Sequence, residues 1–266
     1  MKKYWIVFQQ SFQNEFVYRL NFILWRFRNV LRILMTYFLW HSVFSSNSNV
    51  FGYSKEQMMA YVFLVLLVTS FVMSAPSNDN VGGEISNGTL NNFLVKPISY
   101  LSYWLTRDWA SKLLNMLFAV FEFSLLWFLF KPQIYFSQSP TQLLLGIFLT
   151  IISALIYFVI TKLAISVAFW TPENTWGFMF IILVFMDVLA GSIFPLDLLP
   201  KSVMTFLQFT PFPYMIYYPI AILVGRVDLI TALKILLQSM AMLGFWYYFV
   251  MKVWKKGLKN YAAVGI

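Results

Sequence analysis

The sequence predicts an all-α polytopic membrane protein that forms a single transmembrane domain over residues 1–266. Of its 266 residues, 60% are hydrophobic and only 11% are charged, whereas soluble domains carry about 25% charged residues. The apolar residues also gather into runs close to the ~20 residues that a helix needs to cross a bilayer. A water-soluble core of this size would not bury so many large apolar side chains, so we expect the helices to lie in a membrane.

Six membrane-spanning helices are expected, with an N-terminal interfacial helix before them and re-entrant half-helices between the fifth and sixth spans. We place the spans near residues 22–44, 57–75, 113–130, 143–160, 176–194 and 233–254. The first span is unusual, because its uninterrupted apolar part, residues 33–44, would cover only about 18 Å as a helix. It must therefore include Arg26, Arg28 and Arg32. We expect these arginines at the cytoplasmic end, where they can reach the lipid headgroups.

The distribution of the basic residues predicts a plasma-membrane protein with both termini in the cytoplasm. In this orientation 14 basic residues lie inside and 5 outside, which together make the 19 in the chain. The inside set is Lys2, Lys3, Arg19, Arg26, Arg28, Arg32, Lys96, Arg107, Lys112, Lys162, Lys252, Lys255, Lys256 and Lys259, and the outside set is Lys55, Lys131, Lys201, Arg226 and Lys234. This bias follows the positive-inside rule. It accounts for the net charge of +9 without a nucleic-acid partner.

The residues before the first span have the pattern of a helix lying on the membrane surface. Trp5, Phe8, Phe12 and Phe16 recur at helical spacing among polar residues, as in interfacial amphipathic helices. Two roles remain open for this helix. It either anchors the start of the chain in the headgroup region or packs on a partner.

Prolines interrupt the apolar segment that we expect to be re-entrant, residues 191–225. Five of the ten prolines lie here, which is too many for one spanning helix. Broken backbone at membrane depth is tolerated only where it packs on protein or lines a wet cavity. Short half-helices that cap a translocation path are therefore expected, with Pro195, Pro211 and Pro213 lining it. The alternative is an aromatic interfacial loop anchored by its tyrosines.

Several kinds of chemistry have no residues to support them. There is no cysteine and only one histidine, His41, so we expect no disulfide, no metal site and no serine triad. No phosphate-binding loop of the G-x-x-x-x-G-K-[ST] type is present. We therefore expect a non-catalytic chain that carries no cofactor of its own.

Two acidic residues, Glu122 and Asp187, fall inside expected spans. Carboxylates in the membrane are costly and usually face a bundle interior or a water-filled cavity. They either line a translocation path or pair with a basic or hydroxyl group for packing, for example with Arg32. Lys112 and Lys162, near the cytoplasmic ends of spans, are expected to be simple anchors.

A polar stretch between the second and third spans predicts a short amphipathic helix over residues 84–96, on the cytoplasmic side. Gly82 and Gly83 permit a tight exit from the span. Glu84 suits a helix start, where a negative charge favours the dipole, and Pro97 ends the helix. The helix is either an ordinary interfacial connector or a ridge that fits a cytoplasmic partner.

The sequence EISNGTLNNFLVKPIS in this stretch resembles the coupling helix of ABC-2 type permeases, the membrane subunits of a class of ATP-driven exporters. Similar elements follow in the same order through most of the chain, and the closest likeness is to drug-resistance-exporter-like permeases. The resemblance implies that this stretch contacts an ATPase. The residues implied are Gly83, Glu84, Ile85, Gly88, Thr89, Leu90, Phe93, Lys96 and Pro97.

The resemblance further implies a transporter of two permeases, from the same or different chains, and two cytoplasmic ABC ATPase subunits that bind ATP and Mg²⁺. Export of an amphipathic or lipid-like substrate through the lipid membrane is the expected activity. A self-sufficient secondary transporter or channel is the alternative, although such proteins favour paired repeats with matching broken helices. A lipid-modifying membrane enzyme is disfavoured because an acid–base set is missing.

Overall fold

The computed structural model describes residues 2–15, 19–46 and 49–261, and this part of the chain is almost entirely helical. Its strands form one short antiparallel hairpin, β1 (Asn49–Val50) and β2 (Tyr53–Ser54), in which Asn49 pairs with Ser54 and Val50 with Tyr53. The all-α prediction is confirmed.

Eleven α-helices and four 3₁₀ helices make up the described part of the chain. The α-helices are α1 (Lys2–Glu15), α2 (Arg19–Val43), α3 (Lys55–Val72), α4 (Ser77–Ser86), α5 (Asn91–Leu94), α6 (Tyr100–Phe130), α7 (Pro140–Ile165), α8 (Thr175–Leu189), α9 (Lys201–Leu207), α10 (Tyr217–Leu223) and α11 (Leu229–Asn260). The 3₁₀ helices are η1 (Ser166–Phe169), η2 (Pro172–Asn174), η3 (Leu196–Leu198) and η4 (Phe212–Tyr214).

Within the described residues, five helical segments are long and apolar enough to cross a membrane: 55–86, 100–130, 140–169, 172–189 and 229–260. The polytopic prediction is thereby confirmed. Helix α2, the expected first span, has the length, but every 18-residue stretch of it contains Arg26, Arg28 and Arg32. Its place in the membrane therefore depends on how these three arginines are paired.

The helices are longer than the apolar runs that predicted them. Helix α6 begins at Tyr100, 13 residues before the expected start at 113, and α11 extends at both ends beyond the expected 233–254. The early turns of α6 were missed because they carry Arg107, Asp108 and Lys112. Two of these side chains, Asp108 and Lys112, are buried against neighbouring helices, so packing compensates for their low hydropathy.

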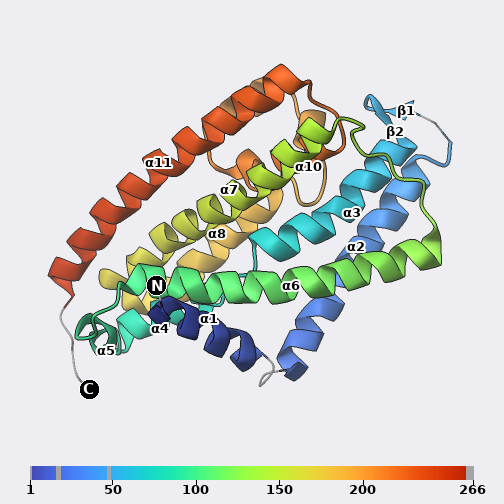
Figure 1. Cartoon of the computed structure of the whole chain (residues 1–266). Coiled ribbons are helices and arrows are strands. Elements are labelled where there is room, and N and C mark those ends of the chain that lie inside the picture. The colour runs from blue at the N-terminus through green and yellow to red at the C-terminus, as the bar shows by residue number, and fades with distance from the viewer. Residues whose placement is uncertain (1, 16–18, 47–48, 262–266) are drawn as a thin grey trace.

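The long helices run roughly side by side between two ends of the molecule (Figure 1). One end, here the hairpin end, carries β1, β2 and the start of α3. The other, here the α5 end, carries α4, α5, the start of α1 and the last turns of α11 (Figure 1). Contacts join these parts of the α5 end, since Lys3 Nζ donates to the Pro97 carbonyl (2.6 Å) and the rings of Tyr100 and Trp254 stack.

Buried apolar side chains form two clusters, one for each end. The larger joins α2, α3, α7 and the segment from η3 to α10, with α3 buried on nearly all sides. The smaller lies toward the α5 end and joins α4, the start of α6, α7, η1 and α11. Helix α4 is thus part of a packed core and not a loose connector.

The proline-rich segment 191–225 forms short helices, as expected for half-helices. Helix α10 is buried throughout most of its length and packs on α7 and α3, whereas α9 is largely exposed. Pro195, Pro211 and Pro213 are all buried inside the chain. The tyrosines at 214, 217 and 218 are also buried, which is not how headgroup anchors would lie.

Helix α1 lies along α6 (Figure 1). Trp5 and Phe8 stack with their ring centroids 5.6 Å apart, and Trp5 is exposed. Phe16, the last aromatic residue of the expected pattern, lies outside the described residues. The helix therefore packs on its own chain while it presents an aromatic edge outward, and both expected roles remain open.

Candidate functional site

The stretch expected to be one helix over residues 84–96 is instead two helices joined by a turn. Helix α4 starts earlier, at Ser77, and ends at Ser86, and α5 covers only Asn91–Leu94. The cause is Gly88, whose φ of 76° is left-handed and stops the helix. Gly83 is therefore inside α4, and Glu84 lies near the end of α4 and not at a helix start.

Glu84 faces its own chain. Its carboxylate accepts a hydrogen bond from the Trp104 indole Nε1 (3.1 Å) and one from the Tyr100 hydroxyl, both on α6. Trp104 is fully buried, so Glu84 satisfies an indole N–H that would otherwise lack a partner. In this structure Glu84 fastens α4 to α6, and its side chain is not the outermost part of the polar stretch.

The apolar residues of the stretch divide into a buried and an exposed set. Ile85 and Leu90 are buried in the smaller core, and Phe93 packs edge-on against Tyr100 with a centroid distance of 5.3 Å. Beyond them, Leu94 and Val95 are 49% and 84% exposed. The residues at 89, 96 and 97 are exposed as well. We name Leu94, Val95, Lys96 and Pro97 the α5 tip.

Helix α4 approaches the start of α8 closely at Gly82. A Cβ atom added there would lie 2.7 Å from the Thr175 side chain, which is closer than such contacts ever are in proteins. Gly82 is thus required for close packing inside a helix, and not for the tight turn that the sequence suggested.

A buried polar elbow joins the end of α3 to the start of α4. The Lys112 ammonium, from α6, donates to the carbonyls of Phe71 (3.2 Å), Val72 (2.7 Å) and Ser74 (2.8 Å). These carbonyls belong to the end of α3 and the bend after it, where helical partners are lost. Lys112 is therefore a buried helix cap and not a membrane anchor.

The other side of the elbow is capped by Asp108, one turn earlier on α6. Its carboxylate accepts from the Ser77 backbone N–H (3.0 Å) and hydroxyl (2.5 Å) at the start of α4. Lys162 of α7 donates to the same hydroxyl (2.6 Å), and Asn78 donates to the Tyr157 hydroxyl (2.9 Å). Lys112 thus caps the end of α3, while Asp108 and Lys162 tie the start of α4 to α6 and α7.

The elbow was not predicted from the sequence, since Lys112 and Lys162 were expected to be anchors. Two local signals point to it: an Asp and a Lys spaced i, i+4 on one helix face at 108 and 112, and the Pro76-Ser77 pair that interrupts the apolar run. The partner of each lysine depends on helix packing, which single-chain patterns do not reveal.

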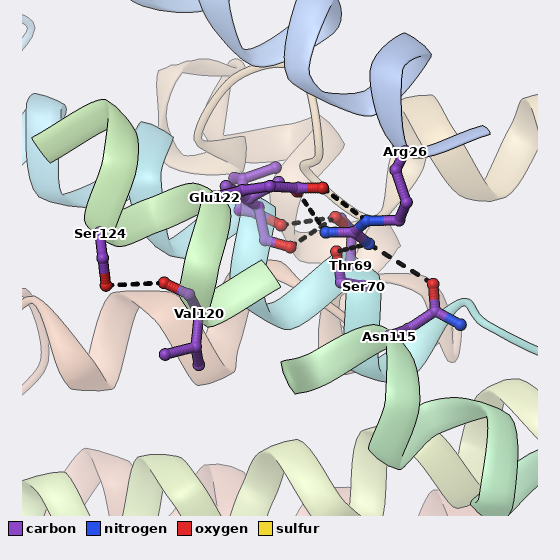
Figure 2. Close-up of polar contacts among 9 residues, drawn as sticks. Arg26, Thr69, Ser70, Asn115, Val120, Glu122 and Ser124 are labelled. Carbon is purple, nitrogen blue, oxygen red and sulfur yellow. Dashed lines mark hydrogen bonds and ion pairs between the residues drawn. The ribbon is translucent and has the colours of Figure 1, made fainter. Parts of the chain in front are cut away.

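A second buried network surrounds Arg26, as Figure 2 shows. Its guanidinium reaches from α2 to α6, where Nε donates to Glu122 Oε1 (2.7 Å) and a second nitrogen contacts Oε2. The third nitrogen donates to the hydroxyl of Ser70 on α3 (3.0 Å) and to Asn115 Oδ1 (3.4 Å). Arg26 and Glu122 are only 5% and 8% exposed. Arg26 is thus neutralised inside the bundle and does not reach outward to lipid headgroups as expected.

The second intramembrane acid also has an arginine partner. Arg32 of α2 donates to both oxygens of Asp187 on α8, at 2.9 and 3.2 Å. Ser192 donates to the main-chain carbonyl of Asp187 (2.6 Å) and to its carboxylate. Unlike the Arg26 pair, these side chains are 35% and 38% exposed. Glu122 and Asp187 therefore both pair with a basic group, which was one of the two alternatives from the sequence. The Arg32–Asp187 pair is in addition partly exposed on the outside of the chain.

A third polar cluster closes the hairpin end. The Tyr53 hydroxyl donates to the Asp197 carboxylate (2.9 Å), and Arg226 bonds the same carboxylate (3.3 Å) while its guanidinium lies 4.0 Å from the Tyr53 ring centroid. Burial and the neighbouring carboxylate raise the pKa of Tyr53 above its usual range, which favours the protonated hydroxyl that donates this hydrogen bond. The cluster joins β2, η3 and the loop before α11.

Comparison with protein families agrees with the resemblance. The family described as "ABC-2 family transporter protein" matches residues 30–265, which is most of the chain. The chain belongs to this family. It is therefore a multi-pass membrane component of ABC transport systems, in a family whose members work with an ABC ATPase. None of the curated proteins compared with the permease matches it. The match covers α4, α5 and the elbow, whereas α1 precedes it.

Proposed function

We propose that the chain is the permease subunit of an exporter that moves an amphipathic or lipid-like substrate and is powered by a separate cytoplasmic ATPase subunit. ATP and Mg²⁺ bind to that partner, and this chain supplies no cofactor. A second permease, identical or different, completes the transporter in the plasma membrane. Both termini and the α5 end face the cytoplasm.

The observation that carries this proposal is the α5 tip. Its two apolar side chains project from a short unit that is otherwise fixed by buried contacts, with Lys96 beside them. Exposed apolar groups on a rigid support suit binding to a protein groove, because little ordering is needed on binding. We therefore assign the docking surface to the α5 tip with Thr89, and a positioning role to Glu84.

The elbow supports a path for the motion. A displacement of α4 acts on α6 through Glu84 and Asp108, and on α7 through Lys162, because these contacts connect the helices directly. Packed, hydrogen-bonded elements transmit displacement as units. ATP binding shifts the permease only if the ATPase contacts the tip differently in its two nucleotide states.

The test is co-purification with a candidate ABC ATPase subunit. Val95→Asp with Leu94→Asp should abolish the complex, because two charges would enter an apolar contact. Phe209→Asp is the matched control, since Phe209 is also strongly exposed but follows α9. Equal retention of the ATPase by both variants would remove the α5 tip from the interface.

A further inference from the structure

The outward-facing ion pair between Arg32 and Asp187 is exposed in a way that a lipid-facing surface does not allow. More than a third of each side chain is open, and both helices are flanked by exposed apolar residues. Charged groups in spanning segments face protein, water or a polar ligand, because contact with acyl chains is too costly. Some polar group must therefore meet this pair in the assembled membrane.

The charge at this place is not balanced. Arg28 lies one turn before Arg32 and interacts electrostatically with both Arg32 and Asp187. Its side chain is exposed, and within the described residues it donates no hydrogen bond. Its guanidinium stacks on the Trp25 ring at 3.9 Å from the centroid. Of these two arginines only Arg32 forms an ion pair with Asp187 in the described part of the chain, so the positive charge of Arg28 is in excess.

Donor groups remain available. The Arg32 Nε–H is buried and has no hydrogen-bond partner in the described part of the chain, so it becomes a donor to a bound anion only if the Arg32 side chain turns outward. The stacked Arg28 guanidinium keeps its edge free, and an arginine fork matches phosphate geometry. Like charges one turn apart repel, so a bound anion would relieve the repulsion between the arginines.

Apolar residues border the charged group on the same helix faces. Met35 is one turn beyond Arg32, and Val184 and Phe180 are one and two turns before Asp187; all three are exposed. A free anion would gain nothing from them, whereas a lipid would lay its acyl chains on them. We propose that Arg28 and Arg32, beside Asp187, form a site for the phosphate head group of an anionic lipid-like amphiphile.

This inference deepens the proposed function, since such an amphiphile would be the exported substrate. Binding itself requires no ATPase, so it is measured on the permease alone by native mass spectrometry, with equimolar phosphatidylglycerol and phosphatidylcholine of the same acyl chains. We expect preferential retention of phosphatidylglycerol. Failure of the wild-type permease to co-purify with the ATPase would refute the proposed function and leave this result unchanged.

The variants distinguish binding at this site from non-specific attraction of an anionic lipid to a positively charged protein. Arg28→Gln should lower phosphatidylglycerol retention about tenfold, as expected for one charged hydrogen bond. Lys252→Gln should leave it unchanged, because Lys252 is likewise exposed and lies over an aromatic ring, that of Tyr248. Asp187→Asn should increase retention, since it removes the competing carboxylate while an amide can still accept from Ser192.

Other occupants give different results. Displacement of the lipid by inorganic phosphate would identify a site for a free anion. Loss of the preference for phosphatidylglycerol in dimers of the permease would show that a second copy of the chain covers the Arg32–Asp187 pair. Either result would overturn the proposal. Equal retention of the two lipids, equal losses in the Arg28 and Lys252 variants, or reduced retention in Asp187→Asn would do the same.

Discussion

The Arg26–Glu122 pair permits a quantitative test of how α2 is held in the bundle. Both side chains are nearly buried, and two nitrogen–oxygen contacts join them. Removing one partner of a buried ion pair leaves an uncompensated charge and costs roughly 3–5 kcal/mol, whereas replacing both by apolar groups is often close to neutral. Arg26→Met and Glu122→Met should each destabilise by about that amount, and the double variant by much less.

The assay is reversible unfolding in mixed detergent–SDS micelles, followed by circular dichroism, for the wild type, both single variants and the double variant. We expect a coupling free energy of about 3 kcal/mol between the two positions. Additive losses in the double variant, or single losses below about 1 kcal/mol, would refute the reasoning. A carboxylate that lined a path would instead alter substrate preference with little change in stability.

Three further outcomes follow from the α5 end. Lys112→Met should destabilise by about 3 kcal/mol, because three carbonyls lose their donor, and hydrogen exchange should accelerate at residues 71–78 but not in α11. Glu84→Gln should preserve ATPase binding, because an amide oxygen still accepts from Trp104; loss of binding would restore Glu84 to the interface. Gly88→Ala should destabilise by about 1 kcal/mol in thermal unfolding, because φ is positive there; an unchanged melting temperature would contradict the turn assignment.

Hydropathy was sufficient for the fold class, because apolar runs of spanning length have few alternatives. It failed at the helix ends, where α6 continues through Arg107, Asp108 and Lys112. Hydropathy scores each residue as if it faced lipid, but Asp108 and Lys112 find buried partners on α3 and α4. Those partners depend on tertiary packing.

The polar stretch between the second and third spans was likewise predicted correctly in part and wrongly in part. Its location between two spans was readable from composition, and the exposed tip lies within it. The single helix was wrong, because Gly88 adopts a left-handed conformation where a helical pattern suggested continuation. Glu84 was assigned outward because the sequence does not reveal Trp104 behind it. From the sequence, each membrane acid was considered to pair with a basic or hydroxyl group, with Arg32 as the example; that Glu122 pairs with Arg26 was not foreseen.

The central claim is that the α5 tip is the surface through which an ATPase drives this permease. The most direct measurement places a photoreactive amino acid at position 95, with position 209 as the control, in membranes that contain both subunits. We predict a cross-link to the ATPase from position 95 whose yield changes on addition of ATP, and none from position 209. Absence of the position 95 cross-link, or equal yields from both positions, would contradict the account.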